Sequence, residues 1–134
     1  MNSLVNLIHL PPISDDRGSL VAVEANKTVP FNIKRAYYIF GGKRDIARGF
    51  HAHKALQQLA ICLMGSCRIS LDDGRNKEEV LLASPTNGLM IQHLVWHEMY
   101  DFSDDCVLLV LADNYYDEDD YIREYNEFIR VVGV

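Results

Sequence analysis

The chain has 134 residues, which suits one domain built around a single hydrophobic core. Its formal net charge of -6 argues against general nucleic-acid binding, because the phosphates of a duplex would repel such a surface. No apolar run approaches the roughly 20 residues of a membrane span, and the N-terminus lacks the pattern of a secretory signal. We therefore expect neither a nucleic-acid partner nor a membrane partner.

Short β-rich runs separated by turn signals fill the chain up to residue 112, a spacing typical of a barrel or sandwich. The turn signals include Asp15 to Gly18, Gly41-Gly42, Gly65-Ser66 and Asp72 to Gly74. Without an internal repeat or a linker, residues 1–134 are predicted to form one domain. The predicted strands are Val5 to Leu10, Leu20 to Glu24, Ile33 to Phe40, a run from His51 continuing through Gln57 to Met64, Cys67 to Leu71, Glu79 to Leu82, Leu89 to Ile91, Val95 to Asp101 and Val107 to Ala112.

Three cysteines, Cys62, Cys67 and Cys106, lie in these apolar runs. An odd number without a CxxC pair predicts buried, reduced thiols and a cytoplasmic location.

The C-terminal segment has a different period. Apolar and aromatic residues recur at helical spacing from Tyr121 to Ile129, after an acidic run that suits a helix N-terminus. This predicts one amphipathic helix from Asp119 to about Arg130, packed against an all-β body.

The segment that indicates chemistry is Arg48-Gly49-Phe50-His51-Ala52-His53. Residues two apart on a strand project from the same face, so His51 and His53 are expected side by side. Arg48 lies an odd step before His51 and needs a bulge to converge with it. His97 belongs to a later strand that can return beside the first one.

The spacing of His51, His53, Gln58, Gly65 and His97 resembles the two motifs of the cupins, which are jelly-roll β-barrels. Metal-binding cupins carry Glu where this chain has Gln58. A divalent metal favours an anionic oxygen ligand, so the neutral amide favours a site without metal or cofactor. A metal-dependent cupin using the three histidines stays open as an alternative.

A metal-free site of this composition suits proton transfer beside a carbonyl. Histidine titrates near neutral pH and can accept and return a proton. Arg48 can stabilise the negative oxygen that develops. Tyr37 shares a strand face with Arg35 and Ile39 and is expected to line the interior.

Together these segments form an ordered series that resembles the dTDP-4-keto-6-deoxyglucose 3,4-ketoisomerases, over about Ile13 to Phe128. The segments are Asp16 to Leu20, Ile33 to Ile39, Arg48 to Lys54, Gly65 to Cys67, Val95 to Met99, Tyr115 to Glu118 and Asp120 to Arg123.

The resemblance implies a metal-free homodimer of small barrels that moves the carbonyl of dTDP-4-keto-6-deoxy-D-glucose from C4 to C3 through an enediol, in the biosynthesis of dTDP-3-amino-3,6-dideoxyhexoses. It implies that His51 is the principal base, that His53 shuttles protons and that Tyr37 acts with them. Substrate-binding residues would be Arg17, Arg48, Gln58 and His97. Arg17 and His97 match the pattern of the galacto-type product.

Other functions remain to be separated. A nucleotide-sugar 3,5-epimerase also needs a histidine base beside a ketone, and a sugar-binding cupin would have no turnover. Lys34, Arg35 and Arg123 are cationic candidates for the nucleotide, with no spacing argument to separate them.

Overall fold

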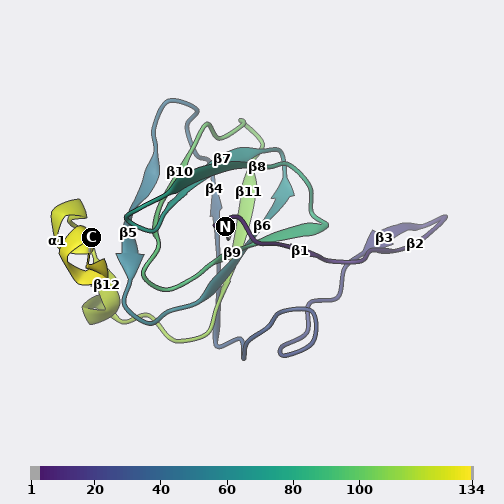
Figure 1. Ribbon diagram of the computed structural model, residues 1–134. Helices are drawn as coiled ribbons and strands as arrows, with labels where there is room; N and C mark the ends of the chain where they lie inside the picture. The colour runs from purple at the N-terminus through teal and green to yellow at the C-terminus, as the bar shows by residue number, and fades with distance from the viewer. Residues whose placement is uncertain (1–3, 134) are drawn as a thin grey trace.

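Two five-stranded antiparallel sheets form the body of the protein (Figure 1). The structure is a computed structural model that describes residues 4–133. The first sheet has the order β1 (Leu7–His9), β9 (Asn87–Ile91), β6 (Gln58–Met64), β11 (Val107–Ala112) and β4 (Arg35–Phe40). The second has the order β12 (Tyr121–Ile122), β5 (Arg48–His53), β10 (Trp96–Tyr100), β7 (Cys67–Asp72) and β8 (Lys77–Leu82).

Alternating side chains create the core between the sheets. In β4 the partly buried residues 35, 37 and 39 alternate with exposed residues, as the period of a strand requires. The main core cluster takes buried residues from both sheets, including Ile69, Leu71, Leu89, Met99 and Val110. The expected all-β fold with a C-terminal helix is confirmed, and it places the inward faces of β4, β5 and β10 around one interior.

Two of the predicted strands extend further than the strands in the structure. The expected strand from Leu20 to Glu24 is wrong beyond Leu20, because β3 (Gly18–Leu20) ends there and the Glu24 carbonyl accepts three backbone N–H groups in a turn. The run from His51 to Met64 is interrupted at residues 54–57. There the backbone N–H of Lys54 bonds to the carbonyl of Asp120 instead of to a neighbouring strand.

The predicted helix from Asp119 to Arg130 is also wrong at its start. Its first residues form a short 3₁₀ helix, η1 (Glu118–Asp120), followed by strand β12, and only then by α1 (Tyr125–Val132). Strand β12 pairs with β5, and Ile122 is fully buried in a cluster with Trp96 and Phe128. Burial of an apolar strand residue on the sheet edge outweighs the helical period here.

A β-bulge interrupts β5 just before the histidine pair. His97 pairs with His51 and Glu98 pairs with Gly49, so Phe50 has no residue opposite it. Gly49 has φ +94° and Phe50 has φ +60°. This is the irregularity that convergence of Arg48 with His51 requires.

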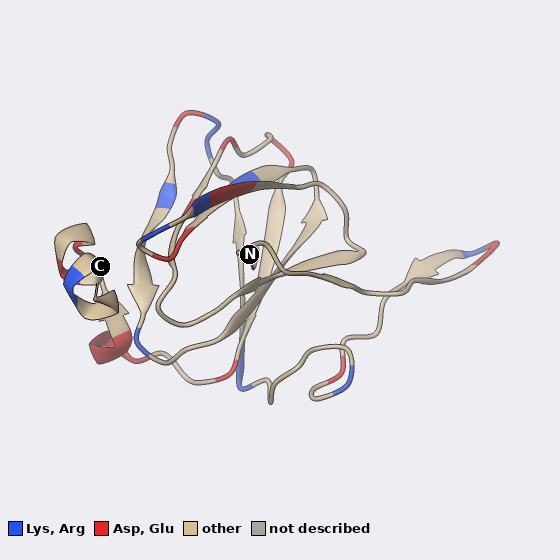
Figure 2. Ribbon diagram, in the orientation of Figure 1, with Lys and Arg blue, Asp and Glu red and all other residues tan. Residues whose placement is uncertain are grey.

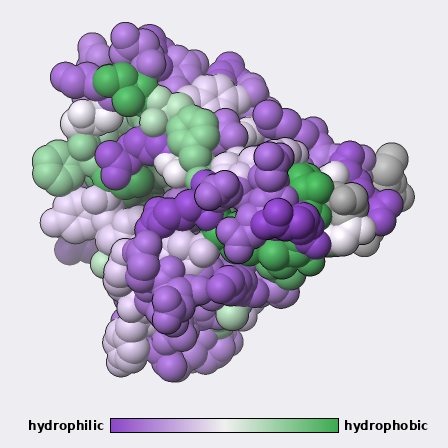
Figure 3. Space-filling model, turned by 90° about the vertical axis from the view of Figure 1, so that its left-hand side faces the viewer, coloured by the Kyte–Doolittle hydropathy of each residue, from purple (hydrophilic) through white to green (hydrophobic). Residues whose placement is uncertain are grey.

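A separate two-stranded hairpin, β2 (Ile13–Asp15) and β3, projects from the body on the side away from β5 and β12 (Figure 1). Its turn carries charges of both signs (Figure 2). Apolar groups gather in separate patches on the opposite side of the molecule, between larger hydrophilic areas (Figure 3). Residues 4–133 contain no helix with the length and apolar character needed to cross a membrane.

Gly49→Ala should destabilise the fold through the bulge. A Cβ at this position would lie 2.9 Å from the His97 carbonyl oxygen, and the backbone φ is one that L-residues avoid. We expect a loss of at least about 2 kcal/mol in the free energy of unfolding, measured by chemical denaturation. Gly133→Ala is the matched control, because Gly133 also has positive φ but its Cβ would meet no atom of the described residues within 4 Å. Equal losses in the two variants would contradict the proposed role of the close approach.

Candidate active site

Three histidine rings converge on the inner face of the second sheet. His51 and His97 are direct partners across the β5–β10 pairing, and their ring centroids lie 4.5 Å apart. The His51 and His53 centroids lie 5.0 Å apart, and those of His53 and His97 6.0 Å. The expectation that His51 and His53 share one face is confirmed, as is the return of the His97 strand beside them.

Each ring has an oxygen acceptor near its Nδ1 atom. For His51 and His97 this is the backbone carbonyl two residues earlier, at 3.1 and 3.4 Å. For His53 it is a carboxylate oxygen of Asp120, at 3.0 Å. An acceptor at Nδ1 places the proton there, which leaves Nε2 of each neutral ring as a lone-pair acceptor.

Burial keeps these rings neutral. It lowers the pKa of His97 to about 3 and, with His53 nearby, that of His51 to about 4. Burial also lowers the pKa of His53, although the hydrogen bond to Asp120 opposes this change. At neutral pH the site therefore presents unprotonated imidazoles, the form that can remove a proton from carbon.

The first sheet supplies a polar pair opposite the histidines. Gln58 Nε2 donates to the Tyr37 hydroxyl at 2.7 Å, and burial raises the pKa of Tyr37. Within the described residues, Gln58 Oε1 is buried without a hydrogen-bond partner, as is Arg35 Nε. These groups are free to contact a ligand that enters between the sheets.

Two cavities of about 290 Å³ each adjoin the histidines. We call the first the arginine cavity; it is lined by Arg35, Tyr37, Ile39, Arg48, Gly49, His51, His97, Met99, Tyr116 and Tyr121. We call the second the aspartate cavity; it is lined by Lys34, Arg35, His53, Ala55, Leu56, Asp113, Asn114, Tyr115, Asp117, Asp120 and Tyr121.

The two cavities differ in charge. Among residues 4–133, the lining of the arginine cavity has two guanidinium groups and no carboxylate, whereas that of the aspartate cavity has three carboxylates and two cations. An anionic ligand is therefore favoured in the arginine cavity, directly over His51 and His97.

Most of the predicted site residues come together. Tyr37, Arg48, His51 and His97 line the arginine cavity, Gln58 bonds to Tyr37, and His53 lies against His51. Arg17 does not join them within one chain. It sits on the projecting hairpin, with 87% of its side chain exposed and paired with Asp15.

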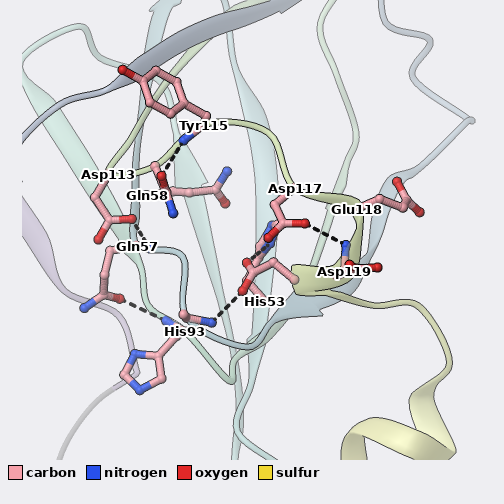
Figure 4. Close-up of polar contacts among 12 residues, drawn as sticks. His53, Gln57, Gln58, His93, Asp113, Tyr115, Asp117, Glu118 and Asp119 are labelled. Carbon is pink, nitrogen blue, oxygen red and sulfur yellow. Dashed lines mark hydrogen bonds and ion pairs between the residues drawn. The ribbon is translucent and has the colours of Figure 1, made fainter.

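Sequence reasoning missed two residues that complete the site. The acidic run before Tyr121 suggests only a helix N-terminus, but Asp120 bonds to His53. The ring centroid of Tyr121 lies 4.9 and 4.5 Å from those of His51 and His53. Figure 4 shows His53 beside this segment, where Asp117 accepts a hydrogen bond from the backbone of Asp119. Local sequence carries no signal for this contact, since the two partners are 67 positions apart.

The three histidines also satisfy one test for a metal site. One ligand nitrogen from each lies within 4.8 Å of the others. All three are neutral donors, and the adjacent Gln58 is a neutral amide. These neutral groups would leave the charge of a bound cation unbalanced, whereas a carboxylate ligand would neutralise part of that charge.

The fold and the site define a small cupin-like protein suited to proton transfer on an anionic ligand. The family described as FdtA (WxcM-like, C-terminal) matches residues 3–133, so the chain belongs to this family. This confirms the resemblance stated from the sequence motifs.

Individual relatives agree with this family. The chain is 56% identical over 127 residues to the TDP-4-oxo-6-deoxy-alpha-D-glucose-3,4-oxoisomerase of Aneurinibacillus thermoaerophilus, covering 95% of this chain and 91% of the relative. It is 46% identical to the 3,4-ketoisomerase QdtA of Thermoanaerobacterium thermosaccharolyticum, solved as a histidine-to-asparagine mutant with TDP-4-keto-6-deoxyglucose, at TM-score 0.95 over 98% and 96% of the chains. It is 47% identical to a 3,4-ketoisomerase of Helicobacter canadensis, at TM-score 0.94 over 97% and 98%.

Folding stability should depend on pH through His97. Its pKa in the folded protein, about 3, lies below the 6.5 of an unfolded chain, so the unfolded state binds protons first. The stability that the neutral His97 ring contributes to the folded state is fully present above pH 6.5, and it is lost as the pH falls from 6.5 toward 3. For His97 we expect a loss of roughly 2 kcal/mol between pH 7 and pH 5, measured by denaturation at both pH values.

His97→Gln should reduce this dependence on pH, because it removes the titrating group. The exposed His93 serves as the control position, and His93→Gln should leave the dependence unchanged. An unaltered slope in His97→Gln would show that the ring does not resist protonation.

Proposed function

We propose that the protein is a 3,4-ketoisomerase that converts dTDP-4-keto-6-deoxy-D-glucose to a dTDP-3-keto-6-deoxyhexose, in the biosynthesis of dTDP-3-amino-3,6-dideoxyhexoses. The observation that carries the proposal is the set of three converging imidazoles against a cavity whose lining, among the described residues, has two arginines and no carboxylate. The activities named for its relatives support the same reaction.

The arginine cavity is suited to the substrate's anionic nucleotide. Arg35 can neutralise diphosphate oxygens, and the rings of Tyr116 and Tyr121 offer faces for a pyrimidine. Arg123 is already paired with Glu118 and lies 4.2 Å over the Tyr121 ring. Among the cationic candidates, Arg35 is therefore the one we assign to the nucleotide.

The reaction needs only proton transfers. His51 removes the proton on C3, the C4 oxygen gains a proton, and an enediol forms. The C3 hydroxyl then loses its proton as C4 receives one, which leaves the carbonyl at C3 without any net oxidation. Arg48 lies in the lining where it can stabilise the developing oxygen charge, and Tyr37 and Gln58 orient the sugar hydroxyls.

The product configuration depends on the face of the enediol that receives the C4 proton. We propose the galacto-type product, with His97 and Arg17 setting that face. His97 lines the arginine cavity directly beside His51.

Incubation with dTDP-4-keto-6-deoxyglucose tests substrate, reaction and stereochemistry together. We expect the carbonyl at C3 and an axial C4 hydroxyl, determined from the C4 proton couplings by NMR. His51→Asn should still bind the dTDP-sugar while turnover falls at least about 10²-fold, because the general base is lost.

The same assay separates the alternatives. Deuterium incorporated at C5 without a shifted carbonyl would indicate a 3,5-epimerase, and full turnover in His51→Asn would sink the catalytic assignment. Turnover lost to a chelator and restored by a divalent metal would favour the metal-dependent cupin. An equatorial C4 hydroxyl would overturn only the stereochemical proposal.

We also propose a homodimer, in which the hairpin of one copy packs on the other. Ile13 and Leu20 face each other across the hairpin and are 65% and 57% exposed. Because an isolated two-stranded hairpin has only marginal stability in water, contact of these side chains with a second copy would stabilise it. The edge strand β4 likewise exposes Tyr38 and Phe40. A second copy that covers these residues would bring its Arg17 near the β4 side of the site.

Replacing Ile13 and Leu20 by Asp should weaken the dimer, because it places two charges on the apolar face of the hairpin. Sedimentation should give a dimer for the native protein and a shift toward monomer for the variant. Ser14→Asp is the control, since Ser14 pairs with Ser19 on the other hairpin face. A monomeric native protein would refute the proposal.

A cytoplasmic location completes the proposal. Cys62, Cys67 and Cys106 are all buried and free, and the Cys62 and Cys106 sulfurs lie 3.9 Å apart without a bond. Adjacent unbonded thiols are typical of a reducing compartment, which supports this location.

A further inference from the structure

Asp120 is held beside His53 by the backbone of the C-terminal segment. It ends η1 and directly precedes β12, whose Tyr121 pairs with His53 across the edge of the second sheet. The Asp120 carbonyl accepts the Lys54 N–H at 2.9 Å. These pairings fix the main chain on both sides of the contact.

The two carboxylate oxygens of Asp120 have separate partners. One accepts the Ala55 backbone N–H at 2.9 Å, and the other lies 3.0 Å from His53 Nδ1. A carboxylate held at both oxygens cannot rotate away, and it only accepts hydrogen bonds. The proton of neutral His53 must therefore sit on Nδ1.

This tautomer leaves His53 Nε2 as an acceptor. The ring is 3% exposed, and Nε2 is buried without a hydrogen-bond partner among residues 4–133. A nitrogen of His53 also belongs to the group of three ligand nitrogens that lie within 4.8 Å of one another with those of His51 and His97. A proton arriving at Nε2 would create an imidazolium whose second N–H already points at an anion.

His53 differs from its neighbours in this respect. The Nδ1 atoms of His51 and His97 face neutral backbone carbonyls, whereas that of His53 faces a full negative charge. Burial lowers the pKa of His53, and the nearby charges of Arg35 and Arg123 lower it further. The Asp120 carboxylate acts in the opposite direction and raises this pKa. Among the three rings, His53 is the one whose charged form has an anionic partner.

We propose that Asp120 is a positioning residue that holds the Nδ1 proton on His53, so that His53 can take up at Nε2 the proton that His51 removes from C3 and return it to the substrate during catalysis. The proposal rests on the proposed isomerase function. It assigns to Asp120 the role of orienting a histidine and stabilising its imidazolium, without contact between Asp120 and the substrate.

Asp120→Asn tests the tautomer directly. Asparagine has one acceptor oxygen, which the Ala55 N–H would occupy, so its NH₂ group would face His53 Nδ1 and drive the proton to Nε2. We expect kcat to fall at least about 10²-fold with KM changed less than about threefold. Asp119→Asn is the matched control, because it removes the same charge from an exposed neighbour in η1 and should leave kcat unchanged.

Nitrogen-15 NMR of the histidine rings provides a readout independent of turnover. The native protein at neutral pH should show His53 protonated at Nδ1 and unprotonated at Nε2, and Asp120→Asn should reverse this. Asp120→Glu retains an anionic acceptor and should recover part of the lost turnover.

A native His53 protonated at Nε2, or full kcat in Asp120→Asn, would overturn the proposal. If Asp120→Asn does not fold, the native spectrum still decides the tautomer. If the native protein fails to convert the dTDP-sugar, the isomerase proposal fails, and the same spectrum separately tests what Asp120 does to His53.

Discussion

The pairing of β5 with β10 is the constraint on which the site depends. It sets His51 opposite His97, and the strand period then places His53 on the same face. The bulge at Phe50 allows this pairing to continue while Arg48 joins the lining of the cavity next to His51. Because Gly49 lies against the His97 backbone, the bulge needs a residue without a Cβ. Geometry of the backbone therefore decides where the three rings meet.

Burial of those rings then determines their chemistry. Removing them from water disfavours the imidazolium, and proximity to one another adds repulsion, so burial favours neutral rings at neutral pH. A carboxylate in place of Gln58 would favour either protonated histidines or a bound cation. The neutral amide instead bonds to Tyr37 and leaves the bases free. The positive charge needed for an anionic substrate comes from Arg35 and Arg48, on the lining of the cavity.

The parts of this arrangement that follow a local period could be predicted from the sequence. The alternation around Tyr37 and the spacing of His51 and His53 each specify a face, and both faces are as expected. Contacts made across the chain could not be predicted in this way. The Asp120–His53 contact depends on β12 adding to the sheet edge, and a helical pattern of apolar residues conceals that strand. The place of Arg17 could not be predicted from a local period either, because its hairpin leaves the body of its own chain.

The C-terminal segment consequently belongs to the chemistry as much as to the fold. Residues 54–57, between β5 and β6, do not continue the sheet. The Asp120 carbonyl of the C-terminal segment accepts the Lys54 N–H there, and the Asp113 carboxylate, just after β11, accepts the Gln57 N–H. Burial of Ile122 and Phe128 against Trp96 anchors the same segment to the second sheet. Loosening that apolar contact would release Asp120 from His53 and Tyr121 from the wall shared by both cavities. Apolar packing at the β12 edge of the second sheet thereby supports the contact between Asp120 and His53.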